Sequence, residues 1–301
     1  MNYLIGIDGG GTKTLLRAAD SGTLALLGEA KGGASNLTAL PEKEVQGNLD
    51  GLLADFFAQS GLSPNDCCGA VLGSAGAGSP DARERLQGML AALLPKSRIL
   101  VEDDALPVLY AGTETGVGMI LISGTGSICL GRNEAGERFR AGGWGHLIGD
   151  EGSGYALGRD VLTAVMEQFD GRGPKTMLTE MVFDRLGLQE PMEIIDWTYR
   201  RGNGKSEIAA LSSLCEKAAL AGDQTALAIF NKAAYELARM AMAVAKKLPG
   251  KHRICVCSGG NLTKAPLLRE KLASKLDGVQ LVLSERDAAD GCLLMAREMM
   301  G

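Results

Sequence analysis

The sequence predicts an α/β protein made of two related halves, each with a partly parallel sheet. Two observations support this fold class. Apolar, strand-like runs alternate with amphipathic, helix-like segments along most of the 301 residues, as is typical of sheets with parallel strands. In addition, one arrangement of strand, glycine-rich turn and strand occurs at the start of the chain and again about a domain's length later.

The first arrangement contains residues 5–14, which read Ile-Gly-Ile-Asp-Gly-Gly-Gly-Thr-Lys-Thr. A short apolar strand runs into three glycines, which let backbone N–H groups approach an anion closely and permit positive φ. Thr12, Lys13 and Thr14 add donors for phosphate oxygens, and Asp8 is placed to reach a phosphate-bound Mg²⁺. The alternative is a tight hairpin that simply needs glycine.

Two common phosphate loops do not fit this segment. A Walker P-loop has lysine directly after its second glycine, whereas Thr12 follows Gly11. A dinucleotide-binding fingerprint has glycines that begin a helix, whereas residues 15–28 are predicted as two apolar strands around a turn at Asp20–Gly22. We therefore predict a strand–turn–strand phosphate grip, with Gly10 at its turn.

Further along the first half, strands and helices alternate. The apolar spacing predicts helices at Glu42–Ser60 and Asp81–Leu94 and strands at Cys68–Gly73 and Arg98–Glu102. The last of these strands presents Asp103 and Asp104 at its carboxyl end, and a small-residue loop before the first helix ends in Asn36. Because ligands of such sheets bind at strand ends, these side chains are candidate site residues.

The opening arrangement then recurs. Strand, hydroxyl-rich turn, returning strand and polar turn are predicted at Val117–Ile122, Ser123–Ser127, Ile128–Gly131 and Asn133–Gly136. Gly124, Thr125 and Gly126 lie in the hydroxyl-rich turn. We interpret the recurrence as an internal duplication with domains of residues 1–115 and 116–301, whose two turns would hold a triphosphate from both sides of a cleft.

The second half becomes mostly helical and then returns to α/β. Helices are predicted at Gly154–Phe169, Lys175–Leu186 and Met192–Arg200, in a long segment capped by Asp223, and at Ala265–Leu276 and Ala288–Met300, with strands at Arg253–Cys257 and Val279–Leu283. The turn Ser258–Asn261, which contains Gly259 and Gly260, is a third glycine-rich turn after a strand.

Composition narrows the functional classes. The apolar fraction of 46% and charged fraction of 22% are typical of a soluble globular protein, and the net charge of −5 argues against a nucleic-acid surface. No apolar run reaches transmembrane length and no basic segment precedes the first strand, so we expect no membrane partner and a cytoplasmic location. The seven cysteines, including Cys67, Cys68, Cys255 and Cys257, are expected to be mostly buried, reduced thiols.

These three turns, together with the aspartates after residue 102, resemble the two phosphate loops and the adenosine loop of the actin, heat-shock chaperone and hexokinase superfamily. The run Gly143-Trp144-Gly145-His146 through Gly149-Asp150-Glu151-Gly152-Ser153 closely resembles N-acetylglucosamine kinases, within the wider group of BadF/BadG/BcrA/BcrD-type ATPases. The resemblance covers essentially the whole chain. It implies two ribonuclease-H-like domains around a cleft for ATP and an amino sugar, with a helical insertion in the second, and relatives are commonly homodimers.

The resemblance also implies roles for individual residues. Asp104 matches the catalytic base, with Asp103 as the alternative if the register shifts by one residue. The implied sugar contacts are Asn36, Gly143, Trp144, Gly145 and Asp150. With the reasoning above, the nucleotide contacts are Asp8, Gly10, Gly11, Thr12, Lys13, Gly124, Thr125, Gly126, Gly259 and Gly260, with Asp8 also serving Mg²⁺.

Purely structural roles are the alternatives for some of these positions. Trp144 would alternatively pack in a hinge, and Asp150 and Glu151 would alternatively supply negative charge to a helix N-terminus. His146 is expected to be a hydrogen-bonded structural residue.

The expected function is ATP-dependent phosphorylation of an amino sugar, with N-acetylglucosamine ahead of glucosamine and N-acetylmuramic acid. One alternative from the same group is an ATPase that activates 2-hydroxyacyl-CoA dehydratases or benzoyl-CoA reductases through an iron–sulfur cluster. Cys129 and Cys215 lie in no cysteine-rich motif, which argues against it. A sugar-sensing repressor is the other alternative, but it would need an added helix-turn-helix domain and a basic face.

Overall fold

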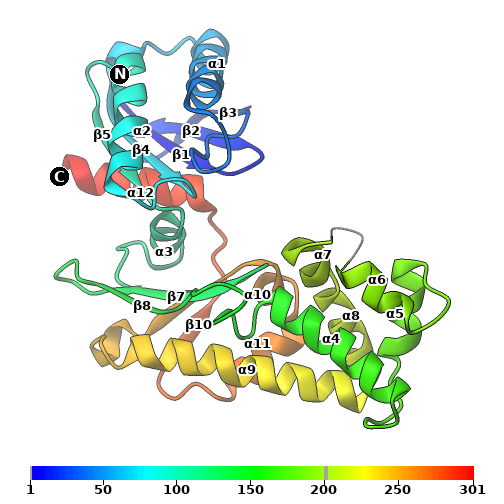
Figure 1. Ribbon diagram of the computed structural model, residues 1–301. Coiled ribbons are helices and arrows are strands. Elements are labelled where there is room, and N and C mark those ends of the chain that lie inside the picture. Colours follow the sequence, from blue (N-terminus) through cyan, green and yellow to red (C-terminus); the bar gives the residue numbers. More distant parts are fainter. Residues whose placement is uncertain (1, 200–202) are drawn as a thin grey trace. The chain divides into compact units, whose positions relative to one another are not determined.

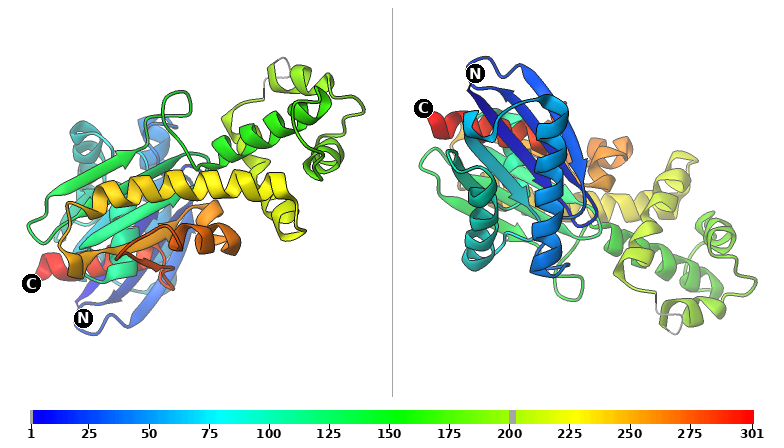
Figure 2. Two further views of the ribbon diagram at one scale, coloured as in Figure 1. Left: turned by 90° about the horizontal axis from the view of Figure 1, so that it is seen from below. Right: turned by 90° about the horizontal axis from the view of Figure 1, so that it is seen from above.

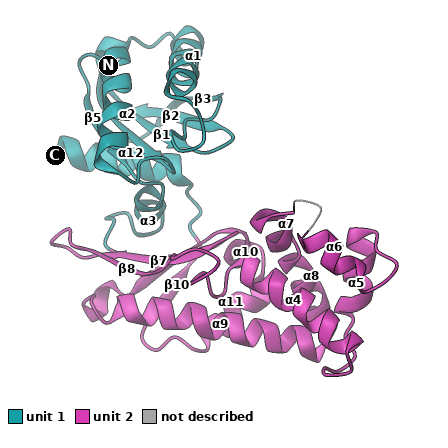
Figure 3. Ribbon diagram, in the orientation of Figure 1, with its two compact units in different colours: residues 1–117, 284–301 teal, residues 118–283 magenta. Residues whose placement is uncertain are grey.

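The computed structural model describes residues 2–199 and 203–301 and divides into two compact units (Figures 1 and 3). Unit 1 comprises residues 1–117 and 284–301, and unit 2 comprises residues 118–283. Each unit has its own five-stranded sheet with helices, so the predicted α/β class is confirmed. No helix of the described residues is long and apolar enough to cross a bilayer.

Unit 1 contains five strands and four α-helices among its described residues. They are β1 (Tyr3–Gly9), β2 (Thr14–Asp20), β3 (Leu26–Gly32), α1 (Glu42–Ser60), β4 (Cys67–Ser74), α2 (Pro80–Leu93), β5 (Arg98–Glu102), α3 (Ala105–Thr113) and α12 (Ala288–Met300). The predicted helices and strands of this part are present. Most of their ends agree within two residues, but the second strand predicted within residues 15–28 is β3, which continues to Gly32. Helix α3 was not predicted; its nine residues are too few for a clear helical period, and they include Pro107.

Unit 2 holds the second sheet and a helical region. Its strands are β6 (Gly118–Ser123), β7 (Ser127–Arg132), β8 (Arg138–Gly142), β9 (Ile254–Ser258) and β10 (Gln280–Val282). Its helices are α4 (Gly154–Phe169), α5 (Leu178–Leu186), α6 (Glu193–Tyr199), α7 (Lys205–Ala210), α8 (Ser212–Leu220), α9 (Gln224–Ala245), α10 (Gly260–Thr263) and α11 (Pro266–Ala273). The predicted end of α6, Arg200, lies outside the described residues.

The two sheets share one topology. Sheet order is β3-β2-β1-β4-β5 in unit 1, and, read from the other edge, β8-β7-β6-β9-β10 in unit 2. In both, the first three strands are antiparallel neighbours, and the first strand pairs in parallel with the fourth and the fourth with the fifth. The repeated sequence pattern therefore corresponds to a repeated ribonuclease-H-like topology, as the resemblance implied.

Strand β1 is buried on both faces. Its residues Tyr3, Ile5 and Ile7 pack in the cluster that contains α1 and α2, while Leu4 packs in the cluster that contains α12. On the α12 side, Gly6 leaves room for the helix, because a Cβ there would lie 2.4 Å from the carbonyl oxygen of Ala289. This glycine of the opening motif is thus required by packing rather than by a ligand.

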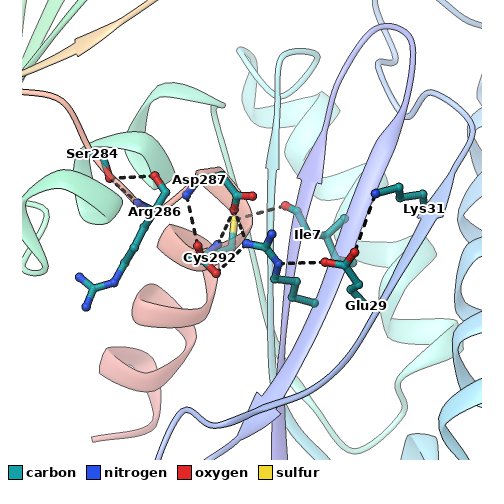
Figure 4. A network of polar contacts seen from close by, with 9 residues as sticks. Ile7, Glu29, Lys31, Ser284, Arg286, Asp287 and Cys292 are labelled. Carbon is teal, nitrogen blue, oxygen red and sulfur yellow. Dashed lines mark hydrogen bonds and ion pairs between the residues drawn. The ribbon is translucent and has the colours of Figure 1, made fainter. Parts of the chain in front are cut away.

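Helix α12 is further anchored by a polar network at its N-terminus (Figure 4). The guanidinium of Arg17, on β2, lies 2.7 Å from a carboxylate oxygen of both Asp287 and Asp290, and the Sγ–H of Cys292 donates to the carbonyl of Ile7. Asp287 and Asp290 also form a capping box. Residues 284–301 therefore belong to unit 1, which differs from the expected second domain of residues 116–301.

In unit 2 the longest helix, α9, lies along the sheet of β6, β7 and β8 (Figure 2). As predicted, Asp223 caps it: one carboxylate oxygen accepts from the N–H of Ala226 at 2.8 Å. The other oxygen accepts from Thr176 Oγ1 and from the N–H of Met177, which ties the start of α9 to the segment before α5. The cap therefore connects the helical region to the sheet-bearing part.

Candidate functional site

The turn between β1 and β2, here called loop 1 (residues 10–13), is tight and exposed. The N–H of Gly10 donates to the carbonyl of Lys13 at 3.0 Å, and the side chains of Thr12 and Lys13 are exposed beside Gly11. No positive φ occurs within loop 1, so the expected left-handed backbone is absent there. The antiparallel pairing of β1 and β2 supplies the turn without it.

The hydroxyl of Thr14, predicted as a phosphate donor, has hydrogen-bond partners within unit 1. The Thr14 side chain points inward as the first residue of β2, where its hydroxyl donates to the carbonyl of Gly33 at 2.7 Å. It also lies 2.9 Å from the hydroxyl of Ser35. The hydroxyl thus fixes the loop after β3 against loop 1.

Asp8 stands at the carboxyl end of β1, half-buried beside loop 1. Burial, and then the negative charges of Asp287 and Asp104, raise the pKa of its carboxyl, while Lys13 acts in the opposite direction. These interactions place three carboxylates of unit 1 within electrostatic range of one another at the end of the sheet.

Asp103 and Asp104 have different environments. One oxygen of Asp103 accepts from the N–H groups of Ala105 and Leu106 at 3.2 and 3.1 Å, so this carboxylate caps α3. Its other oxygen lies 3.6 Å from the guanidinium of Arg83. Asp104 makes no side-chain cap hydrogen bond; its carboxyl reaches solvent, and the surrounding protein followed by the charge of Asp103 raises its pKa.

Asn36 lies beside loop 1. Its side-chain oxygen accepts from both the N–H and the hydroxyl of Thr38, at 2.8 and 2.7 Å, which fixes the orientation of the amide. Its amide nitrogen lies 3.9 Å from where a Cβ of Gly11 would stand. Unit 1 therefore brings Asn36 next to the predicted phosphate turn.

In unit 2 the turn between β6 and β7, here called loop 2 (residues 124–126), is held by the start of α4. The N–H groups of Gly154 and Tyr155 donate to the carbonyls of Gly124 and Thr125 at 2.7 and 3.3 Å, and the Thr125 side chain is exposed. Gly126 accepts at its carbonyl from the N–H of Gly124. Loop 2 and the segment before α4 therefore form one hydrogen-bonded piece.

Asp150 is buried against loop 2, with 7% of the residue exposed. One oxygen accepts from the N–H of Ser127 at 3.2 Å, and the other lies 2.7 Å from Nζ of Lys205 on α7. The alternative role at a helix N-terminus falls instead to Ser153, whose hydroxyl accepts from the N–H of Ala156. Lys205 had not been predicted as a site residue, because a single lysine 55 residues from its partner carries no sequence signal.

Trp144 lies on a small exposed loop between Gly143 and Gly145, whose φ angles are +72° and +89°. The loop closes through hydrogen bonds between Trp144 N–H and the Gly149 carbonyl, and between Gly149 N–H and the Gly145 carbonyl. Trp144 is 63% exposed, and its indole lies under the guanidinium of Arg140, 4.5 Å from the ring centroid, so it does not pack as a buried hinge.

His146, on the same loop, is exposed. Its ring lies edge-on to Tyr155, with 4.9 Å between centroids. The contact found for it is thus aromatic, whereas a hydrogen-bonded structural role was expected.

The third glycine-rich turn touches loop 2 through the backbone. Gly259 has a φ of +81°, and a Cβ there would lie 2.4 Å from the carbonyl oxygen of Ser123, so only glycine fits. Asn261 donates to Ser123 Oγ and to the Gly124 carbonyl and accepts from Ser212 Oγ, joining the turn to α8. The segment thereby holds the exposed Gly260 beside loop 2.

A cavity of about 420 Å³ opens beside this turn, lined by Gly260, Asn261 and residues of α8 and α11. Glu216 of α8 faces it, and neither of its carboxylate oxygens has a partner in hydrogen-bond geometry among the described residues. Burial raises the pKa of this carboxyl, although the nearby backbone of Leu267 favours the ionised form. A buried acceptor without a partner is costly in a native structure and is frequent at functional sites. No motif pointed to Glu216.

The cysteines are mostly buried, as predicted. Cys67, Cys255 and Cys257 are buried and Cys68 is half-buried. Cys129 and Cys215, considered above as cluster ligands, are also buried, and burial raises the pKa of both thiols. Protonated thiols inside an apolar core are poor metal ligands.

Comparisons with known proteins agree with this architecture. The chain is 35% identical over 303 residues to the N-acetylmuramic acid/N-acetylglucosamine kinase of Clostridium acetobutylicum, covering 99% of each chain. It is 30% identical over 309 residues to the N-acetyl-D-glucosamine kinase of Dictyostelium discoideum, covering 97% of each chain.

A solved structure from Chromobacterium violaceum, described as a candidate N-acetylglucosamine kinase, superposes with a TM-score of 0.71. It is 28% identical and covers 98% of this chain and 99% of its own. The pattern that defines the BadF/BadG/BcrA/BcrD ATPases matches residues 5–296, nearly the whole chain. The chain therefore belongs to the BadF/BadG/BcrA/BcrD ATPase family.

Proposed function

We propose that this chain is an ATP-dependent kinase of an amino sugar, with Asp104 as the catalytic base. The observation that carries the proposal is the contrast between the two adjacent aspartates at the end of β5. Asp103 is engaged in capping α3, whereas Asp104 makes no cap hydrogen bond, reaches solvent and interacts electrostatically with Asp8 beside loop 1. The names of the relatives supply the class of acceptor.

In the proposed reaction, an oxygen of the sugar hydroxyl forms a bond to the γ-phosphorus of ATP. The bond between that phosphorus and the ADP oxygen breaks, and the hydroxyl proton passes to the carboxylate of Asp104. A carboxyl with a raised pKa accepts a proton more readily, and a positioned base of this kind contributes about 10²–10⁴-fold. Loop 1, with Thr12 and Lys13, supplies exposed donors for the phosphates.

The donor set also fits Mg²⁺. Asp8 is half-buried, and its burial followed by the charges of neighbouring carboxylates raises its pKa; a divalent cation would relieve such repulsion. The described residues contain no cluster of three or more possible protein ligands, and Mg²⁺ in kinases usually takes one or two carboxylates with substrate phosphates and water. When bound, the ion neutralises charge on the β- and γ-phosphates.

We assign the adenosine to the cavity beside Gly259 and Gly260. Its wall carries the exposed Gly260 together with Glu216, whose unpartnered oxygens suit the hydroxyls or the amino group of a nucleoside. Loop 2, with Thr125, would then contact the phosphates, since Gly259 and loop 2 are in direct backbone contact.

We assign the sugar to Asn36 and to the loop of Gly143, Trp144, Gly145 and Asp150. The amide of Asn36 and the carboxylate of Asp150 offer the donors and acceptors that sugar hydroxyls need, and the exposed indole offers an apolar face. N-Acetylglucosamine is the leading acceptor because it occurs in the names of both curated relatives described above and of the solved structure.

ADP formation should be measured with N-acetylglucosamine, N-acetylmuramic acid, glucosamine and glucose, with and without Mg²⁺. The proposal expects Mg²⁺-dependent turnover with at least one amino sugar and little turnover with glucose. Thr125→Val should raise the KM for ATP more than that for sugar, and Asn36→Ala should do the reverse. ADP formation at the same rate without any sugar would contradict the kinase assignment and favour an activator ATPase.

A further inference from the structure

Unit 2 contains another, solvent-open cavity of about 690 Å³, lined by residues of α4, α6 and α7 beside the loop of residues 143–149. This volume lies in the range of small-molecule binding sites. Neither the adenosine assignment nor the proposed sugar contacts use it. Its lining combines basic, aromatic and aliphatic side chains, so its chemistry can be examined for the ligand it would accept.

The cavity wall adjoins the proposed sugar contacts. His146, in its wall, directly follows Gly145. Lys205, also in its wall, lies 2.7 Å from the carboxylate of Asp150. A group attached to a sugar held by Gly145 and Asp150 would therefore lie next to two residues of the cavity wall.

The charged residues in the wall are all basic. Arg159, Arg172 and Lys205 line the cavity with His146, and none of the described lining residues is acidic. The carboxylates that accompany these cations, Asp160, Asp170 and Asp150 at 3.1, 2.6 and 2.7 Å, are not part of the wall. An anion entering the cavity would thus meet cations rather than carboxylates on the described part of its wall.

Much of the remaining wall is aliphatic. Leu162, Met166 and Ile208 come from α4 and α7, and Ile194 and Ile195 from α6. Such a surface suits a short alkyl group rather than a highly hydrated phosphate. The combination of cations and aliphatic side chains therefore matches a carboxylate carried on a small alkyl chain.

We propose, resting on the kinase function above, that this cavity binds a carboxylate-bearing ether substituent of the acceptor sugar. The 3-O-lactyl group of N-acetylmuramic acid has this chemistry: one methyl group, one carboxylate and an ether link to the amino sugar. Arg159 and Lys205 interact with its carboxylate and the aliphatic wall with its methyl group. The volume exceeds that of a lactyl group, so the site also accommodates a residue joined to it.

The test compares N-acetylmuramic acid with its methyl ester, which keeps the shape and loses the charge. For the wild-type protein, kcat/KM should be at least about tenfold higher for the acid, because a charge-assisted contact is worth about 1.5–3 kcal/mol and 1.4 kcal/mol is tenfold. In Arg159→Gln this acid-to-ester ratio should fall towards one. Added NaCl should lower the wild-type ratio as well.

Lys232→Gln is the matched control. Lys232 shares Asp160 with Arg159, at 2.7 Å, but does not line the cavity. The acid-to-ester ratio should stay at the wild-type value in this variant. An equal loss in both variants would attribute the effect to Asp160 and overturn the proposal.

Other outcomes separate the two proposals. If N-acetylglucosamine is phosphorylated and N-acetylmuramic acid is not, the substituent site is wrong and the kinase function stands. If no amino sugar is phosphorylated, the kinase function itself is wrong. If Arg159→Gln raises the KM for ATP equally with every sugar, the cavity serves the nucleotide and the substituent proposal is overturned.

Discussion

At the scale of single residues, the proposed phosphoryl transfer depends on which of the adjacent carboxylates of Asp103 and Asp104 can accept the proton of the sugar hydroxyl. We expect Asp104→Asn to lower kcat by about 10²-fold or more, since it removes the base without changing its size. Asp103→Asn is the matched control: asparagine also caps helices, so α3 should keep its cap and kcat should change far less. Steady-state kinetics would decide, and the reverse pattern would make Asp103 the base.

The raised pKa of Asp104 also predicts a stability effect. The pKa of this carboxyl is higher in the folded protein than in the unfolded chain. As the pH rises from the unfolded-state pKa through the folded-state pKa, ionisation of Asp104 therefore lowers the free energy of unfolding. Asp104→Asn should therefore raise Tm at pH 7, and the difference from wild type should shrink as the pH is lowered towards 4, because a larger fraction of the wild-type carboxyl is then protonated. Thermal unfolding at both pH values measures this. An equal Tm difference at both would exclude the electrostatic cause.

Replacing Glu216 should stabilise the folded protein and weaken ATP binding. Removing a buried, unpartnered carboxylate in Glu216→Ala should raise Tm, because its desolvation is no longer required. If this carboxylate contacts the nucleoside as proposed, the KM for ATP should rise about tenfold, corresponding to about 1.4 kcal/mol. The KM for sugar should change little. A higher Tm with an unchanged KM for ATP would leave Glu216 outside the nucleotide site.

At the scale of elements, the contact between β1 and α12 explains part of the opening motif. Gly6→Ala should destabilise unit 1 by about 1–3 kcal/mol, because the new Cβ would overlap the Ala289 carbonyl oxygen in α12. Gly11→Ala is the control: a Cβ there meets at most the Asn36 amide at 3.9 Å. Urea unfolding compares the two. Equal stability of both variants would show that α12 can move away from β1 without cost.

At the scale of the whole molecule, the chain passes between its units at residues 117–118 and 283–284. We expect residues 1–117 alone to be unfolded, since β1 and β4 would expose the face that α12 covers. Joining residues 284–301 to them through a flexible linker should restore cooperative unfolding, measured by circular dichroism. Cooperative folding of residues 1–117 without α12 would contradict this assignment.

The proposed reaction also predicts a change in overall dimensions. It assigns one ATP to loop 1 and loop 2, which belong to different units, and phosphoryl transfer requires water to be excluded from the γ-phosphate. Small-angle scattering should therefore give a smaller radius of gyration with sugar and a non-hydrolysable ATP analogue than without them. An unchanged radius, together with rapid ATP hydrolysis in the absence of sugar, would contradict a sugar-gated kinase.

The sequence by itself determined most of the long helices and the strands of the repeated pattern. Helices α1 and α4 occupy the residues predicted for them, because apolar period and caps are set by neighbours within a few positions. The glycine-rich turns were predictable for the same reason. The resemblance, carried by short runs of residues, was enough to identify the family and the repeated topology.

The tertiary structure decided how these pieces are used. Arg17 and Asp287 are 270 residues apart in the chain, and only folding shows that they join α12 to unit 1. In the same way, the inward turn of Thr14, the pairing of Lys205 with Asp150 and the unpartnered carboxylate of Glu216 depend on residues far away in sequence. No local pattern encodes such contacts, because burial and long-range pairing fix a side chain's partners only when the whole unit has formed.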